Sequence, residues 1–190
     1  MVEKVIVVIP TSMEDIDLAQ KAALVHKIRA GMECEVHIAI DHDKEGWVAM
    51  HNKLFKATKN EYYVYSCADY IPGRNYLVRA FRLLEGSDVG LVGFNDGKWD
   101  GQIATVGIVK RSWAKENYEG DLFFPGYKYH YGDTELTNYA IVNEQYAYCP
   151  NAILMEIDYN KEVKQVNVQD RKKYNERKVK MTDMTKEEKV

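Results

Sequence analysis

The sequence predicts an α/β protein with a mostly parallel central sheet flanked by helices. Short apolar runs rich in β-branched residues, such as KVIVVIP at 4–10, are typical of strands buried on both faces. Each of the first three such runs is followed by a segment whose apolar residues have helical spacing. These connections are long enough for the right-handed crossovers that join parallel strands.

The first half of the chain alternates strand and helix. Ser12 is a candidate cap for the first helix, and Pro72 is allowed at the first position of the third. The expected strands are 4–10, 34–41, 61–69 and 88–94, and the expected helices are 12–32, 46–60 and 72–86.

The second half is less regular. We expect a strand that runs into a short helix over 101–117, an aromatic loop over 118–133, a helix over 133–145, one or two short strands over 146–158 and a terminal helix over 168–180. Apolar density falls from about residue 160. We therefore expect one α/β domain over 1–160, divided near residue 97, and a charged, partly helical tail over 161–190.

Charge is distributed unevenly along the chain. The 190 residues carry a net charge of −3, but the tail has ten Lys and Arg against six Asp and Glu, a net of +4. The tail could contact an anionic surface such as a membrane or nucleic acid, or it could be a solvated helix.

Cysteine usage and hydropathy indicate a compartment. The three cysteines are far apart and form no Cys-x-x-Cys pair, which excludes a zinc knuckle and fits a reducing environment. The apolar run near the N-terminus is too short for a signal peptide, and no stretch approaches the roughly 20 apolar residues of a membrane helix. We expect a cytoplasmic protein without a transmembrane segment.

Polar and acidic residues follow each strand of the first half. In open parallel sheets ligands bind beyond the carboxyl ends of the strands. The residues at those ends are Pro10-Thr11-Ser12, Asp41-His42-Asp43, Ala68-Asp69-Tyr70 and Asn95-Asp96. Each acid alone could be an ordinary turn residue, since Asp and Asn serve well in turns. Together, the acids at one edge suit a divalent cation and a diphosphate.

Other phosphate-binding and catalytic motifs are missing. The sequence has no Gly-x-Gly-x-x-Gly, no P-loop, no Gly-x-Ser-x-Gly and no His-Glu-x-x-His. Without a glycine-rich cradle, a metal ion would have to offset the charge of a diphosphate.

Several local motifs, in order, resemble family-2 glycosyltransferases with the glycosyltransferase-A fold. VIVVIPTS resembles the opening strand, whose end contacts the nucleotide, and VHIAID resembles the second strand, whose last Asp faces the base or ribose. GWVAMHNKLFKATKNEYYVY resembles the Gly-to-Asn segment that leads into the third strand. SCADYIPGRNYL resembles the stretch with the metal-binding Asp-any-Asp motif, and YHYGDTEL resembles the acidic motif near the acceptor. The resemblance covers roughly Lys4 to Asp158.

The resemblance implies an inverting transfer of sugar from a nucleotide-diphosphate sugar to a hydroxyl acceptor on a glycan, a nucleic acid base or a protein. Residues 1–97 would be the nucleotide-binding half, and residues 98–160 the acceptor and catalytic half. Asp133 would be the catalytic base, and Asp69 would hold Mn²⁺ or Mg²⁺. The resemblance places the donor against Pro10, Thr11, Ser12, Asp41, Asn52, Ala68 and Asp69.

The chain departs from the family pattern at two positions. Cys67 replaces the first acid of the metal motif, and Gly132 stands where the family often has Glu. A soft sulfur does not suit Mg²⁺ or Mn²⁺, so Asp69, diphosphate oxygens and water would bind the metal. Asp133 could also simply cap the following helix. Two alternatives remain: a non-catalytic nucleotide- or glycan-binding module on the same fold, and a nucleotidyltransferase.

Overall fold

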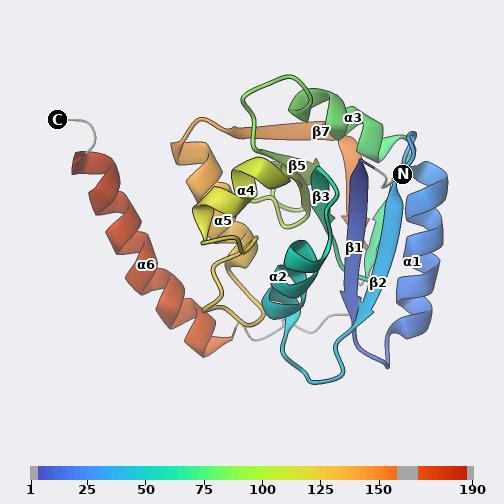
Figure 1. Ribbon diagram of the computed structural model, residues 1–190, viewed down its shortest axis with the longest axis horizontal. Coiled ribbons are helices and arrows are strands. Elements are labelled where there is room, and N and C mark those ends of the chain that lie inside the picture. The colour runs from blue at the N-terminus through green and yellow to red at the C-terminus, as the bar shows by residue number, and fades with distance from the viewer. Residues whose placement is uncertain (1–3, 158–166, 188–190) are drawn as a thin grey trace.

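A single mixed sheet forms the centre of the protein (Figure 1). The computed structural model describes residues 4–157 and 167–187. Its strands are β1 (Val5–Thr11), β2 (Glu35–Ile40), β3 (Tyr62–Tyr65), β4 (Tyr70–Pro72), β5 (Leu91–Asn95), β6 (Gly107–Lys110) and β7 (Tyr146–Glu156). Its helices are α1 (Ile16–Arg29), α2 (Trp47–Ala57), α3 (Tyr76–Leu84), α4 (Arg111–Asn117), α5 (Gly132–Val142) and α6 (Val168–Glu187).

The seven strands have the order β2-β1-β3-β6-β5-β7-β4. β1 pairs in parallel with β2 and β3, and β5 pairs in parallel with β7. β6 lies between β3 and β5 and is antiparallel to both, and β4 is antiparallel to β7. The expected mostly parallel sheet flanked by helices is confirmed. The antiparallel insertion of β6 was not predicted.

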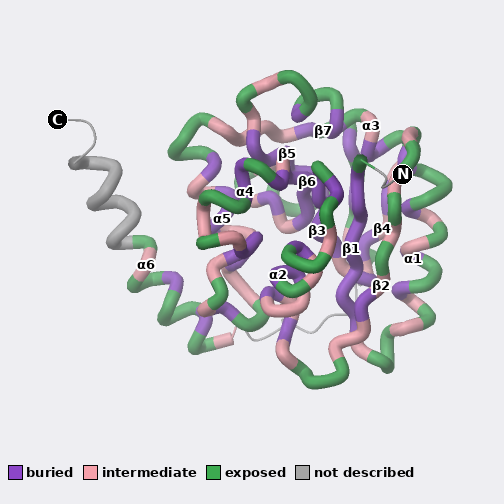
Figure 2. The backbone as a smooth tube through the Cα atoms, in the orientation of Figure 1, coloured by how far each residue is buried: buried purple, intermediate pink, exposed green. Residues whose placement is uncertain are grey.

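Both faces of the sheet are covered by helices. Along β1, Val5, Val7 and Ile9 pack in the core beneath α1 and α3, whereas Ile6 and Val8 pack in the core beneath α2, α4 and α5. Every residue of β1 is buried, as Figure 2 shows in purple. This two-sided burial explains the unbroken apolar run, because alternation along the strand supplies both cores.

Some element boundaries differ from the predictions. Pro72 does not open a helix: it ends β4 and pairs with Leu154 of β7, and α3 begins at Tyr76. A proline is tolerated there because β4 is an edge strand. The expected third strand is shorter, since Ser66 to Asp69 leave the sheet. Residues 146–156 form one strand, with a shift in its register between Phe94 and Asn95 of β5.

The first three turns of α6 pack against the body of the protein. Their side chains contact the loop before α5 and α5 itself. Residues 158–166 and 188–190 of the expected tail lie outside the described part of the chain. Within that part, no helix has the length and apolar character needed to cross a bilayer.

Candidate active site

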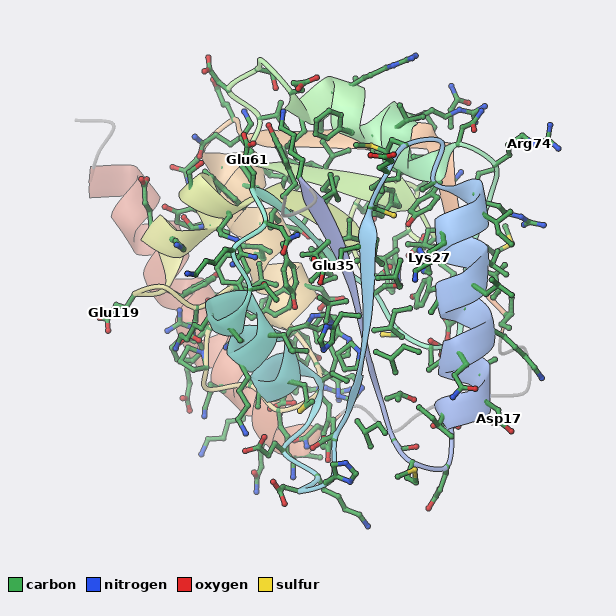
Figure 3. The ribbon with its side chains drawn as sticks, turned by 45° about the vertical axis from the view of Figure 1, so that its right-hand side comes forward. Asp17, Lys27, Glu35, Glu61, Arg74 and Glu119 are labelled. Atoms are coloured by element: carbon green, nitrogen blue, oxygen red, sulfur yellow. The ribbon has the colours of Figure 1, made fainter. Side chains whose placement is uncertain are left out.

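The carboxyl ends of β1, β2 and β3 meet at one edge of the sheet. The backbone N–H of Asp41, after β2, donates to the carbonyl of Thr11, the last residue of β1, at 2.9 Å. The N–H of Ser66, after β3, donates to Val8 of β1 at 3.1 Å. Figure 3 shows Asp17, in the first turn of α1, at this same end of the molecule. The predicted ligand edge therefore brings the three strand ends together, and we call it the donor edge.

Asp41 shapes the loop that leads into α2. Its carboxylate accepts hydrogen bonds from the backbone N–H groups of Glu45 at 2.9 Å and Gly46 at 2.8 Å. Gly46 has a φ of +101°, and a Cβ there would lie 2.5 Å from the carbonyl oxygen of Lys128. Glycine is therefore required both by the backbone angle and by the close approach of the loop before α5.

The other predicted donor residues take different positions. Pro10 lies within β1, paired with Ala39 of β2, and Ala68 is buried beyond β3. Ser12 is exposed, and its hydroxyl accepts from the N–H of Asp15 and donates to the Asp15 carboxylate. This local turn explains why α1 begins at Ile16 rather than at Ser12.

Asn52 lies in α2 with both ends of its amide engaged within the protein. It donates to the carbonyl of Phe123 and accepts from the N–H of Phe123, each at 2.9 Å. The amide therefore clamps the aromatic loop to α2. Contact with a nucleotide stays a prediction for Asn52, whereas the structure gives it a role in holding the loop.

His51, beside Asn52, ties α2 to the end of β3. It is fully buried, accepting from the Tyr63 hydroxyl at 2.9 Å through Nδ1 and donating from Nε2 to the carbonyl of Ser66 at 3.2 Å. Burial lowers its pKa to about 3. The imidazole is therefore neutral, and it fixes the backbone just before Asp69.

Asp69 lies in the segment between β3 and β4 and is partly exposed. Its carbonyl accepts from the N–H of Ile157, so the end of β7 also reaches this edge. Among the described residues, no three His, Cys, Asp or Glu side chains gather to hold a metal. The donor set there is one hard carboxylate, which suits Mg²⁺ or Mn²⁺ only when other oxygen ligands complete the shell.

Asp133 lies in the first turn of α5, within the acidic motif YHYGDTEL. Burial raises the pKa of its carboxyl group to about 6, and the charge of Asp96 adds to the rise. Hydrogen bonds from the N–H of Thr134 at 2.8 Å and from the Thr134 hydroxyl at 3.3 Å oppose that rise. The group is thus a carboxylate at neutral pH with an unusual affinity for a proton.

Contacts across the sheet connect Asp133 to the donor edge. The pKa of Tyr65, the last residue of β3, is raised by burial and further by the charge of Asp133. The Tyr65 hydroxyl donates to the carbonyl of Ala104 at 2.8 Å, and the N–H of Ala104 donates to Thr137 of α5 at 3.0 Å. The charge of Asp133 therefore acts at the end of β3, the strand whose continuation carries Asp69.

From the sequence alone, Asp96 is an acid at a strand end to which no role is assigned. It is almost fully buried after β5 and accepts from the N–H groups of Lys98 and Trp99 at 2.8 and 3.0 Å and from the Thr105 hydroxyl at 2.6 Å. These bonds shape the loop before β6, where Trp99 remains partly exposed. The acidic strand end was the signal, but no local pattern indicates that its charge acts on Asp133.

A buried ion pair beside Asp133 was missed entirely. Glu135 of α5 is fully buried and pairs with Arg177 of α6 through bonds of 2.7 and 2.8 Å, and it also accepts from the Tyr127 hydroxyl at 2.6 Å. The guanidinium lies over the ring of Phe124, 3.4 Å from its centroid. The sequence shows an acid at position 135, but no local pattern identifies Arg177, 42 residues away, as its partner.

Comparisons with known proteins show the fold. No family model matches the chain, and no curated protein matches it in sequence. Among solved structures, the mannosyltransferase PcManGT from Pyrobaculum calidifontis, in complex with GDP-Man and Mn²⁺, is 16% identical with a TM-score of 0.63. A variant of Drosophila β-1,4-galactosyltransferase 7, in complex with manganese, UDP-Gal and xylobiose, is 14% identical with a TM-score of 0.65. S. aureus TarS is 14% identical with a TM-score of 0.53.

The extent of these matches is unequal. The first covers 85% of this chain and 59% of the mannosyltransferase, the second 90% and 79%, and the third 80% and 60%. At these identities the likeness is one of fold. The chain has a glycosyltransferase-A-type fold, as its motifs predicted, and it spans less than two thirds of the mannosyltransferase.

Proposed function

We propose that the chain transfers a sugar from a nucleotide-diphosphate sugar to an acceptor hydroxyl, with inversion and with a divalent metal. The observation that carries this proposal is Asp133: a carboxylate with a pKa of about 6, in the first turn of α5, whose charge acts on Tyr65 at the end of β3. On a glycosyltransferase-A-type fold, the donor edge is where a nucleotide belongs. Two of the solved structures with this fold hold GDP-Man or UDP-Gal with manganese, which supports the same class of donor.

Asp133 acts as the general base in this mechanism. Its carboxylate takes the proton of the acceptor hydroxyl as that oxygen bonds to the anomeric carbon. The bond from the anomeric carbon to the phosphate oxygen breaks, and the electron pair leaves with the nucleoside diphosphate. Attack from the side opposite the leaving group inverts the anomeric centre. A pKa raised toward neutrality makes the carboxylate a stronger base while leaving it mostly ionised at pH 7.

Asp69 would hold Mg²⁺ or Mn²⁺ at the donor edge. When bound, the metal supplies a positive charge that stabilises the diphosphate as it leaves. The single carboxylate fits a cation that completes its shell with phosphate oxygens and water. Asp41 and His51 keep the surrounding loops in place, since the first holds the turn into α2 and the second holds Ser66.

Donor binding tests the proposal. Thermal unfolding is followed with uridine, guanosine, cytidine and adenosine diphosphates, each with and without Mn²⁺. One of the nucleotides at 100 times its Kd should stabilise the protein by about 2.7 kcal/mol, or roughly 5–10 °C, only when Mn²⁺ is present. Stabilisation by none of the four would overturn the proposal.

Two variants make this test specific. Asp69→Asn should abolish the Mn²⁺-dependent stabilisation, because the amide removes the charged metal ligand. Asp88→Asn is the matched control, since Asp88 is an exposed acid in the loop before β5, outside the donor edge, and it should behave as the wild type. Release of nucleoside diphosphate from the nucleotide-sugar then separates a transferase from a module that only binds.

A further inference from the structure

The first turn of α6 meets the loop that leads to Asp133. The Asp170 carboxylate is 3% exposed and accepts three consecutive backbone N–H groups, from Lys128 at 3.0 Å, Tyr129 at 2.9 Å and His130 at 3.1 Å. Successive N–H groups that converge in this way form a concavity suited to an anion. Here the anion is a side chain supplied from 40 residues further along the chain.

Asp170 is itself held firmly on α6. The side-chain oxygen of Asn167 accepts from the N–H of Gln169 at 2.9 Å and from the N–H of Asp170 at 3.1 Å, which caps the helix. An acid in the first turn is also favoured by the helix dipole. The carboxylate therefore reaches the loop from a rigid element.

Three further side chains in the first three turns of α6 contact the body of the protein. Lys173 donates to the carbonyl of Gly126 at 2.7 Å, Tyr174 stacks on Tyr131 with ring centroids 4.7 Å apart, and Arg177 pairs with Glu135. Together with Asp170, these positions are spaced by three or four residues, so they lie on one side of the helix. The remaining side chains described on α6 beyond Asp170 are exposed.

The loop that Asp170 holds is fixed from its other side by α2. The carbonyl of Lys128 accepts from the N–H of Val48 at 3.1 Å, while the N–H of Lys128 donates to Asp170. Just beyond, Tyr131 has a φ of +71°, a left-handed conformation that turns the chain into α5. The direction in which Asp133 leaves this turn thus depends on how residues 128–130 are anchored.

We propose that Asp170 is a positioning residue for the base, which holds residues 128–130 so that Asp133 points at the acceptor hydroxyl. This inference rests on the proposed function. Its structural part, the anchoring of the loop by α6, can be measured without activity. A base displaced by about 1 Å can slow a reaction a hundredfold, so the loss of three hydrogen bonds at this loop is felt in the chemical step.

Asp170→Asn is the test. The amide keeps the size of the side chain but replaces one acceptor oxygen with a donor that faces N–H groups. We expect kcat to fall about tenfold to a hundredfold, with the donor KM and the Mn²⁺-dependent nucleotide stabilisation unchanged. Hydrogen exchange at the amides of Lys128, Tyr129 and His130 should accelerate. Asp170→Glu, which keeps the charge, should recover part of kcat, and it remains informative if the Asn variant does not fold.

Glu176→Gln is the matched control. Glu176 is an exposed acid on the same helix, and its loss should leave kcat and amide exchange unchanged. A wild-type kcat in Asp170→Asn, in an enzyme that transfers sugar, would overturn the inference. Unchanged exchange at the three amides would overturn it as well. A wild type that transfers no sugar, with faster exchange in Asp170→Asn, would reject the proposed function and leave the anchoring role of α6 standing.

Discussion

The donor edge is built differently from the surroundings of Asp133, which include Glu135, Asp170 and Arg177 and which we call the base side. At the donor edge, the hydrogen bonds of acidic side chains join close neighbours in the sequence: Asp41 binds N–H groups four and five residues away. At the base side, Asp133 itself binds the adjacent Thr134, but the acids that anchor its surroundings span long intervals, 42 residues between Asp170 and Lys128 and 42 between Glu135 and Arg177. Asn52 reaches Phe123 over 71 residues.

The contrast separates two tasks. The donor edge offers partly exposed carboxylates on loops after strands, which a charged ligand and a metal can complete. Under the proposed function, the base side has only to hold one carboxylate in a fixed place. The Glu135–Arg177 ion pair and aromatic rings contributed by α2, α5 and α6 surround it. Substitutions at the base side should therefore affect chemistry and stability, whereas those at the donor edge should affect binding.

The largest expected effect comes from Asp133→Asn. The amide has nearly the same shape and can still accept from Thr134, but it cannot take a proton from the acceptor. Since general bases typically contribute 10²–10⁴-fold, we expect kcat to fall by about that factor. Initial rates of nucleoside diphosphate release measure it.

Nucleotide binding supplies the control for Asp133→Asn. If the two regions are separate, Mn²⁺-dependent stabilisation by nucleoside diphosphate stays at the wild-type value in this variant. Loss of both activity and binding would mean that Asp133 supports the donor edge as well, and the comparison drawn above would fail.

The same contrast explains what the sequence could predict. The alternation of β1, α1, β2 and α2 follows from local periodicity, and so does the position of Asp41 just after β2. Asp69 does not end β3 as expected, because β3 stops at Tyr65 and Asp69 lies in the turn before β4. Pro72 was misplaced because its pairing with Leu154 lies 82 residues away and has no local signal. The insertion of β6 between β3 and β5 was missed for the same reason.

The base side was predicted only through its motif. YHYGDTEL identified Asp133 by resemblance, but nothing local indicated which residues hold it. Asp170 and Arg177 lie in a segment so rich in charge that a solvated helix was an open interpretation. The spacing of Asp170, Lys173, Tyr174 and Arg177 was visible as one helical face, yet its partner surface exists only in the folded chain.

Arg177→Ala should produce the largest loss of stability. The substitution removes the guanidinium that binds the fully buried Glu135 in bidentate fashion, while the Tyr127 hydroxyl still donates to Glu135. Breaking a buried pair from one side costs about 3–5 kcal/mol, and because Arg177 is itself partly exposed we expect about 2–4 kcal/mol. Urea unfolding measures the change. Arg171→Ala, on the exposed side of α6, should change stability by less than about 0.5 kcal/mol. Equal losses of stability in the two variants would show that the contact between α6 and the body does not stabilise the fold.

Asp133→Asn should also stabilise the protein at neutral pH. The folded-state pKa of about 6 lies above the ordinary value of 3.8, so the folded protein binds the proton more tightly than the unfolded chain does. Stability due to protonated Asp133 is therefore full below pH 4 and is lost as the pH rises through 6. Asn stays neutral throughout, so the variant should gain about 3 kcal/mol over the wild type at pH 8 and almost nothing at pH 4. A variant less stable than the wild type at pH 8 would mean that the folded protein favours the charge.

The smallest expected effect is the fall of kcat/KM at acid pH, the acid limb of the rate profile. It is also the most direct test of the comparison between the two regions. A base with a pKa of about 6 is about one tenth ionised at pH 5, so kcat/KM should be about tenfold lower there than on its plateau above pH 7. Asp170→Asn should lower the plateau because it moves the base, while the limb stays near pH 6 as long as Asp133 remains buried. A limb near pH 4 in the wild type would contradict the role of burial, since it is the behaviour of an ordinary solvated carboxylate. The base side would then be no more specialised than the donor edge, and its long-range contacts would serve stability alone.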